Sequence, residues 1–310
     1  MNKKRICIFT NDVETTSLWN NCLSDETGEK VFKQGIPGLI EIFNKYNIKT
    51  TFFFTGYFVE KFPEAVKLVH NYGHEVGCHG YYHDVENAYD VLPYNIQLEQ
   101  LKKCKANLEK IIGHTITSFR APALRVNNDT ALALSEAGFK IDSSICPQRA
   151  DFVFSFGSKQ KIKWLTANRK PYISKKTNLF EVGDDGVFEI PLSAMLLPYI
   201  GTFMRISPTI TSTLRFFLHF ESSITGKPIV FLIHPNEVII EKIKNRKVNR
   251  RSKSFIGYLI KDYLRYKLKL KNLGENTLVL LEKQIKFFKK QEYEFLTMEQ
   301  YYNLRIKDGQ

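Results

Sequence analysis

Two histidines and two acids supply the side-chain types that bind a divalent metal ion. His79 and His83 lie four positions apart in the stretch Gly73–Asp84, directly after a short apolar run. On one turn of helix, or in a turn just past a strand, this spacing brings both imidazoles within reach of one ion. A carboxylate must come from elsewhere, and Asp12 and Glu14, just past the first apolar run, are the best candidates. Histidine pairs at this spacing also arise by chance on helix surfaces, so the pair alone is weak evidence for a metal site.

Apolar runs alternate with helix-like stretches along most of the chain. A short apolar run predicts a buried strand, and apolar residues spaced three and four apart predict a helix. The alternation is typical of an α/β fold with a parallel sheet or a β/α barrel, in which ligands bind at the carboxyl ends of the strands. Strands are expected at 5–10, 50–56, 75–79, 117–122, 140–144, 229–235 and 294–297, and helices at 35–47, 59–72, 94–112, 128–138 and 275–290.

Five short motifs stand at the ends of these expected strands, and their order resembles that of the polysaccharide deacetylase (NodB-homology) family of metal-dependent carbohydrate amide hydrolases. The similarity covers residues 5–145 and resumes at 229–234 and at the C-terminal helix and strand. It implies a single catalytic domain over residues 1–310 with the fold of that family, a distorted (β/α)7-type barrel. The matching residues are Thr10–Glu14, His79–His83, Phe119–Pro122, Asp142 and Leu232–His234.

The first motif departs from the family pattern of two adjacent acids. Asp12 keeps the first place, but Val13 takes the second and cannot coordinate a metal ion. Family members with an Asp-x-(Asp/Glu) version use the acid two residues on, so the resemblance implies that Glu14 joins His79 and His83 as metal ligands. Zn²⁺ is the expected ion. If Glu14 points away from the histidines, then Asp12 must be the ligand or the site is metal-free.

The resemblance also implies four catalytic residues. Asp12 is expected to act as the base, and Arg120 is expected to pair with it and keep it ionised. His234 is expected to protonate the leaving amine, with Asp142 holding its imidazole protonated and aligned. Each residue has an ordinary structural alternative: a loop cap for Asp12, a surface ion pair for Arg120, a turn residue for Asp142 and a core histidine for His234.

Residues 147–228 break the alternation. The stretch mixes basic and aromatic residues with prolines and glycines. A long irregular insertion in a compact fold is usually a lid or a substrate-binding surface, so we expect residues 147–228 to face the substrate. A β-hairpin that decorates the barrel is the equal alternative.

The basic residues gather at the C-terminal end. The chain has 45 Lys and Arg against 32 Asp and Glu, a net charge of +13. Residues 241–310 hold 18 of these bases and 8 of the acids, which is +10 of the +13. Within them, the segment 241–272 mixes bases with apolar residues, as in an amphipathic surface that rests on anionic lipid. No nucleic-acid motif accompanies the charge, so no nucleic-acid partner is expected.

The N-terminal residues predict the compartment. The apolar run Ile6–Phe9 is too short for a signal peptide and continues into polar residues. We therefore expect a cytoplasmic protein, at the inner face of the membrane if the basic segment contacts lipid. The five cysteines are scattered and lack a Cys-x-x-Cys pair, which favours reduced thiols.

Together these observations predict metal-dependent hydrolysis of an N-acyl group, acetyl or formyl. The substrate would be an amino sugar of a surface polysaccharide or of a polyprenyl-linked glycan precursor. Two alternatives keep the same residues. One is a catalytically silent glycan-binding relative, which Val13 and Gly80, in place of the family's Asp and Ser or Thr, would suit. The other is a deacylase of a non-carbohydrate amide.

Overall fold

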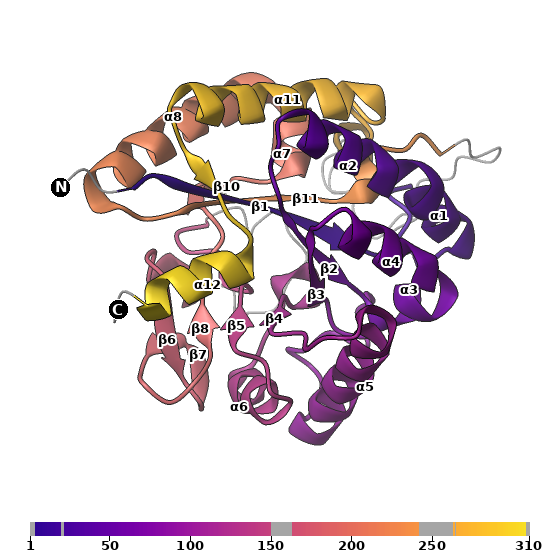
Figure 1. Ribbon diagram of the computed structural model, residues 1–310, viewed down its shortest axis with the longest axis vertical. Helices are drawn as coiled ribbons and strands as arrows, with labels where there is room; N and C mark the ends of the chain where they lie inside the picture. The colour runs from indigo at the N-terminus through magenta and orange to yellow at the C-terminus, as the bar shows by residue number, and fades with distance from the viewer. Residues whose placement is uncertain (1–3, 20–21, 150–162, 242–262, 264, 308–310) are drawn as a thin grey trace.

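A curled parallel sheet forms the centre of the structure, a computed structural model that describes residues 4–19, 22–149, 163–241, 263 and 265–307. Neighbouring parallel strands follow the order β11-β1-β2-β3-β4-β5-β8. Figure 1 shows β1 crossing the middle of the molecule, with helices around the sheet. The strands are β1 (Ile6–Val13), β2 (Thr51–Phe54), β3 (Glu75–Cys78), β4 (Ser118–Phe119), β5 (Ile141–Asp142), β8 (Phe188–Glu189) and β11 (Ile229–Ile233).

The central strands are buried on both faces. Every residue of β1, β2 and β11 is buried, which explains why these strands are almost continuous apolar runs in the sequence. Phe9 of β1 lies at the centre of an aromatic cluster, with ring centroids 5.1 Å from Phe231 and 5.5 Å from Phe295. Phe295 belongs to β12 (Glu294–Phe295), a short strand that pairs with the start of β1.

Most helices connect consecutive parallel strands, as in a β/α barrel. The expected helix at 59–72 is divided in two, because Pro63 cannot donate a backbone hydrogen bond and Phe62 leaves the helical conformation. Among the described helices, none is long and apolar enough to cross a bilayer. The helices are α1 (Asp25–Lys30), α2 (Ile36–Lys45), α3 (Gly56–Lys61), α4 (Pro63–Asn71), α5 (Tyr94–Ile112), α6 (Asn128–Glu136), α7 (Gly201–Ile206), α8 (Pro208–Thr225), α10 (Arg265–Lys269), α11 (Glu275–Lys290) and α12 (Met298–Lys307).

The described part of 147–228 contains more regular structure than the sequence predicts. Its β8 is a strand of the barrel sheet, and antiparallel β6 (Tyr172–Lys175) and β7 (Asn178–Val182) extend the sheet beyond it. A small hairpin, β9 (Ala194–Met195) with β10 (Leu197–Pro198), and helices α7 and α8 follow. The hairpin expected as an alternative is therefore present, next to a barrel strand.

Ser193 closes the curled sheet. Its backbone N–H donates to the carbonyl of Val230 at 3.2 Å, and its hydroxyl accepts from the N–H of Val230 at 3.0 Å. Ser193 lies just after β8 and Val230 lies in β11, so these two bonds join opposite ends of the strand order. The sheet consequently forms a distorted barrel whose parallel strands present their carboxyl ends at one rim.

Candidate active site

The sequence-predicted site residues meet at the carboxyl rim of the barrel. Because the strands are parallel and in register, the residues that end them lie side by side. Val13 pairs with Phe54, Phe54 with Cys78 and Phe119 with Asp142. The residues placed at this rim are Asp12 and Glu14 at the end of β1, His79 after β3, Arg120 after β4, Asp142 at the end of β5 and His234 after β11.

His79 presents one nitrogen lone pair to the interior of the site. Its Nδ1–H donates to the carbonyl oxygen of Arg120 at 2.8 Å, and the ring is fully buried. Nε2 has no hydrogen-bond partner among the described residues. Burial lowers the pKa of His79 to about 4, so the ring is neutral near pH 7. A neutral imidazole whose other nitrogen is held by a carbonyl is the usual form of a metal ligand.

Glu14 and His83 complete a group of three ligand atoms. One atom each from Glu14, His79 and His83 lie within 4.8 Å of one another. Nε2 of His83 is 2.9 Å from Oε2 of Glu14. Burial acts to raise the pKa of Glu14, but the charge and hydrogen bond of His83, with smaller effects of the other two histidines nearby, outweigh it and lower the pKa to about 2. Two nitrogens and one carboxylate oxygen, with one buried nitrogen lacking a partner, fit a divalent ion such as Zn²⁺.

Asp12 is held by Arg120 beside this group. Nη1 of Arg120 donates to Oδ1 of Asp12 at 3.0 Å and to the hydroxyl of Thr10 at 2.6 Å. The same guanidinium also donates to Ser143. Its Nε bonds the Ser143 carbonyl oxygen at 2.9 Å, and its Nη2 bonds the Ser143 hydroxyl at 2.8 Å. The second oxygen of Asp12, Oδ2, lies 3.6 Å from Nε2 of His79. The group of three possible ligands therefore contains Glu14 and not Asp12, whose Oδ2 lies on the His79 side of the carboxylate.

Asp142 pairs with an acid that the sequence analysis missed. Glu189 of β8 lies opposite Asp142 in the sheet, and both side chains are fully buried. Burial and the charge of Asp142 raise the pKa of Glu189 well above its usual range, so Glu189 keeps its proton. Oε1 of Glu189 accepts from the N–H of Ile145 at 3.1 Å. A strand assignment for residues 188–189 would have placed this acid at the rim.

The expected contact between Asp142 and His234 is absent. Oδ1 of Asp142 accepts from the hydroxyl of Ser144 at 2.6 Å, and no hydrogen bond or ion pair joins Asp142 to His234 in the described part of the chain. Ser144 in turn accepts from the N–H of Ala121 at 2.9 Å. Asp142 therefore supports the turn that carries Arg120. His234 is half-buried and lies close enough to Glu14 for its charge to lower the pKa of that acid.

Asn236 is a second residue that sequence reasoning missed. Its Nδ2 donates to the carbonyl of Thr16 at 2.9 Å and lies 3.5 Å from Oε1 of Glu14. Asn236 is buried two positions after His234, in a short 3₁₀ turn, Pro235–Glu237, after β11. Its amide therefore limits the orientation of the Glu14 carboxylate.

Gly80 occupies the position where the family has a Ser or Thr. Its φ is +69°, and a Cβ at this position would lie 2.8 Å from the Tyr89 ring and 3.0 Å from Pro122. The local backbone therefore requires glycine. The missing hydroxyl does not release His79, whose ring is held by the Arg120 carbonyl.

The predicted basic segment 241–272 falls mostly outside the described residues. Its first residue, Glu241, is buried and accepts hydrogen bonds from Ser17 at 2.8 Å and from Thr27. Residues 242–262, which contain most of the bases of the segment, are not described.

Residues 25–141 match the family model for polysaccharide deacetylase. Over 163 residues the chain is 31% identical to peptidoglycan deacetylase-like protein FGM2 of Gibberella zeae. This match covers 49% of this chain and 47% of that protein. Over 117 residues it is 33% identical to the peptidoglycan deacetylase of Helicobacter pylori, with 36% and 37% covered. The chain thus matches less than half of the length of these curated relatives.

Two solved structures show the fold. A chain from Mycobacterium smegmatis, assigned as a polysaccharide deacetylase, superposes with a TM-score of 0.57 at 22% identity, over 76% of this chain and 78% of that one. A CE4 family pseudoenzyme from Bacillus anthracis has a TM-score of 0.50 at 14% identity, over 96% and 66%. At these identities the likeness concerns the fold alone, and it confirms the expected distorted (β/α)7-type barrel.

Proposed function

We propose, because residues 25–141 of this chain belong to the polysaccharide deacetylase family, that the protein hydrolyses N-acyl groups on the amino sugars of a surface polysaccharide. The observation that carries the proposal is the meeting of Glu14, His79 and His83 beside the Asp12–Arg120 pair. Peptidoglycan, named for the relatives from Gibberella zeae and Helicobacter pylori, is the first polysaccharide to test. A polyprenyl-linked glycan precursor is the second.

Glu14, His79 and His83 would hold the metal ion, and Zn²⁺ is our candidate. When bound, such an ion polarises the acyl oxygen and lowers the pKa of a water molecule, which supplies a nucleophile near neutral pH. Three protein ligands leave a position open, as catalytic rather than structural zinc sites do.

The protein side chains would move the two protons of the reaction. Oδ2 of Asp12 takes a proton from the attacking water, while Arg120 fixes the orientation of the carboxylate by donating to Oδ1. The water oxygen adds to the acyl carbon, and the carbon–nitrogen bond breaks. His234 gives a proton to the leaving nitrogen, so that one amide and one water become a carboxylic acid and an amine.

The two buried acids, Asp142 and Glu189, would position other residues of the site and would not exchange protons with the substrate. Asp142 accepts from Ser144, and Ser144 accepts from the N–H of Ala121, next to Arg120. With Glu189 protonated beside it, Asp142 holds the turn that carries Arg120. Arg120 then keeps the Asp12 carboxylate in one orientation.

The location of the protein remains part of the proposal. We propose a cytoplasmic enzyme at the inner face of the membrane, with the segment 241–272 in contact with anionic lipid. The concentration of bases in this segment supports the contact, since each base near an anionic surface adds about 1 kcal/mol of attraction. Deletion of residues 242–253 tests it, because an affinity for anionic liposomes that the deletion leaves unchanged contradicts a contact through this segment.

Metal content and acyl release test the enzyme assignment. The purified protein should contain about one divalent ion per chain, lost in His79→Ala and kept in His70→Ala, a matched histidine on α4 away from the rim. Acetate or formate release from amino-sugar oligomers, including peptidoglycan fragments, should vanish in Asp12→Asn. A folded, metal-loaded protein that binds glycans without releasing an acid would instead identify a silent relative. Release only from non-carbohydrate amides would identify the other alternative.

A further inference from the structure

Helix α8 is apolar on two opposite faces. Its inner face packs on α7, β9 and β11 through Leu214 and Leu218. The outer face follows the helical spacing of three and four residues and is open to solvent. Its exposed residues are Ile210 (51% exposed), Phe216 (58%), Phe217 (47%), Phe220 (61%) and Ile224 (62%).

This outer face needs an apolar environment. The three phenylalanines on α8 are the exposed phenylalanines of the described part of the chain. A contiguous exposed apolar patch marks a protein or membrane contact. An ordinary solvent-facing helix would carry charged residues at these positions.

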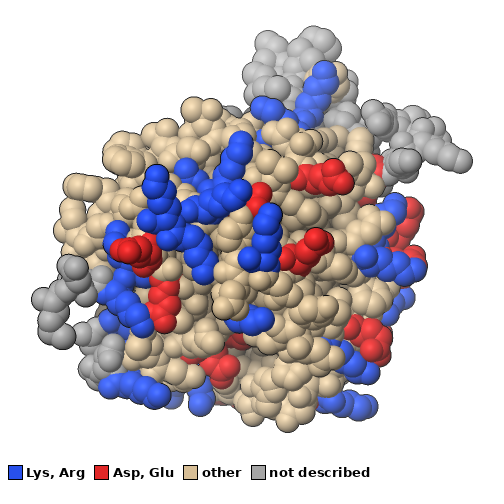
Figure 2. Space-filling view, turned by 45° about the horizontal axis from the view of Figure 1, so that its top comes forward, with Lys and Arg blue, Asp and Glu red and all other residues tan. Residues whose placement is uncertain are grey.

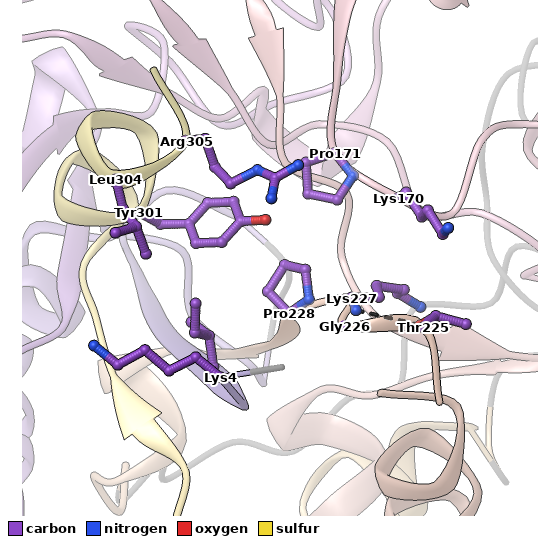
Figure 3. Close-up of a pocket in the computed structure, with 11 residues that line it drawn as sticks. Lys4, Lys170, Pro171, Thr225, Gly226, Lys227, Pro228, Tyr301, Leu304 and Arg305 are labelled. Carbon is purple, nitrogen blue, oxygen red and sulfur yellow. Dashed lines mark hydrogen bonds between the residues drawn. The ribbon is translucent and has the colours of Figure 1, made fainter. Parts of the chain in front are cut away.

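A cationic cavity lies at the C-terminal end of α8. Thr225, Gly226 and Lys227 line a cavity of about 420 Å³, which Figure 3 shows between the end of α8 and α12. Its cationic lining residues are Lys4, Lys170, Lys227 and Arg305, and none of its described lining residues is an acid. Lys4 and Lys227 are ion-paired with Glu294 and Glu221, so the positive charge offered to a ligand comes mainly from Lys170 and Arg305. In Figure 3 the Tyr301 hydroxyl and the Arg305 guanidinium point into the space above Pro228.

Further cations flank the apolar face. The one acid of α8, Glu221, is paired with Arg169 at 2.5 Å and with Lys227 at 3.1 Å, so its charge is already neutralised. Arg215 joins α8 to α11 by donating to the carbonyl of Lys283 at 3.2 Å. Helix α11 exposes Lys283, Lys286, Lys289 and Lys290. Figure 2, in which the top of Figure 1 comes forward, shows Lys and Arg side chains gathered on this side of the molecule, with Asp and Glu side chains among them.

We propose that α8 is a membrane-docking surface. Its outer face would enter the interface of an anionic bilayer, and the cavity at its end would receive the phosphate of a lipid headgroup. An apolar stripe flanked by bases fits this partner. A second copy of the chain fits less well, because the same cations would meet each other across the interface, and the net charge is +13.

The docking surface would place the carboxyl rim beside the bilayer. Helix α7, which precedes α8, starts at Gly201, close to Ile233 and Glu237 at the rim end of β11. The C-terminal end of α8 connects through Gly226 to the start of β11, at the end of this strand that lies away from the rim. With α8 in the plane of the membrane, the barrel lies on its side and its rim opens along the lipid surface. This deepens the proposed function, and it favours a lipid-linked glycan as substrate.

Vesicle binding by the full chain tests the proposal without reference to catalysis. Cosedimentation is measured with phosphatidylcholine vesicles that contain or lack phosphatidylglycerol. Phe216→Ser/Phe220→Ser should lower partitioning about tenfold or more, because two phenylalanines leave the apolar phase. Leu132→Ser/Val182→Ser, which removes two exposed apolar side chains from α6 and β7, should leave it unchanged. Lys170→Gln/Arg305→Gln should lower binding only to the anionic vesicles.

Three results would overturn the proposal. The first is a wild-type chain that does not bind vesicles. The second is an α8 variant that is folded, as its melting curve shows, and binds vesicles as the wild type does. The proposal would be overturned in the same way if, in addition, the separate deletion of residues 242–253 abolished binding. The third is a wild-type dimer that Phe216→Ser/Phe220→Ser converts to a monomer, which would assign the face to self-association. Acyl release from a soluble substrate, measured separately, reports on the enzyme assignment alone.

Discussion

Nδ1 of His79 donates to the carbonyl oxygen of Arg120, and the side chain of the same Arg120 donates to Asp12. The turn after β4 therefore positions both a metal-facing nitrogen and the candidate base. A shift of this turn would disturb the two halves of the site together, whereas a change of the Arg120 side chain removes its contact with Asp12.

Replacing Arg120 should cost both activity and stability. Arg120→Met leaves the buried carboxylate of Asp12 without its cation, and loss of one partner of a buried pair destabilises a protein by about 3–5 kcal/mol. Urea unfolding and acyl release measure the two effects. The matched control is Lys67→Met, which removes an exposed pair with Glu64 and should change stability by less than about 1 kcal/mol. Equal effects of the two variants would contradict the assigned role of Arg120.

Loss of Asn236 should weaken metal binding. Asn236→Ala removes the amide that bridges the Thr16 carbonyl and Glu14, and such outer partners typically contribute 10- to 100-fold to metal affinity or activity. Competition with a chromophoric chelator measures the affinity. Asn178→Ala on β7 serves as the control. An unchanged affinity in Asn236→Ala would show that Glu14 is oriented without it.

A serine at position 80 should destabilise the protein more than a serine at position 113. Both glycines have positive φ, +69° and +78°, so each variant carries a backbone cost of about 1–2 kcal/mol. Only at Gly80 does the new Cβ meet other atoms, and overpacking adds about 1–3 kcal/mol. Comparing the free energies of unfolding of Gly80→Ser and Gly113→Ser isolates the contacts with Tyr89 and Pro122. Equal values would mean that both neighbours move aside freely.

Glu189 should tolerate glutamine but not alanine. Because Glu189 is protonated, the amide of Glu189→Gln can still donate to Asp142 and accept from the N–H of Ile145. We expect a change below about 1 kcal/mol for glutamine, and a loss of about 1–3 kcal/mol for alanine, which leaves buried groups without partners. Urea unfolding at neutral pH measures both. A large loss in Glu189→Gln would indicate an ionised Glu189.

His74 should make stability fall in mild acid. Burial lowers its pKa from 6.5 to about 4, and its Nδ1 accepts from the N–H of Thr50 at 3.2 Å. Above pH 6.5 the ring is neutral in both states. As the pH falls from 6.5 to 4, His74 becomes protonated in the unfolded chain but stays neutral in the folded chain. The free energy of unfolding therefore falls by up to about 3 kcal/mol.

The difference between wild type and His74→Leu measures this contribution. Free energies of unfolding at several pH values should show a shallower fall for His74→Leu between pH 6.5 and 4. His70→Leu on α4 should keep the wild-type slope. Parallel curves for wild type and His74→Leu would contradict a neutral, buried His74.

The sequence predicted the rim better than the elements around it. Helix 94–112 and helix 275–290 are found with the predicted bounds, because both have long apolar spacing and clear ends. Strand β8 was missed because two residues give no periodicity, and Glu189 was missed with it. Helix α1 is not among the predicted helices because Asp25–Lys30 is polar, and only its Ser24 cap indicates a helix start.

The contacts of single side chains could not be predicted in the same way. The motif order placed Asp12, Glu14, His79, His83 and Arg120 at one rim, because parallel strands align their ends. Motif order contains no information on which oxygen meets which nitrogen. Asp142 therefore bonds Ser144 in the structure, although its motif suggested His234.

The ring of strands is joined at Ser193 by two hydrogen bonds, whereas β1 and β11 share five registered pairs. Such a narrow seam should open at lower free energy than the rest of the barrel. Amide hydrogen exchange would then be fastest at Ser193 among the strand-pairing amides and slowest in β1. Ser193 is followed by Ala194, whose carbonyl accepts from Arg169, and Arg169 is paired with Glu221 near the end of α8. A force on that end of the helix would therefore reach the joint of the barrel.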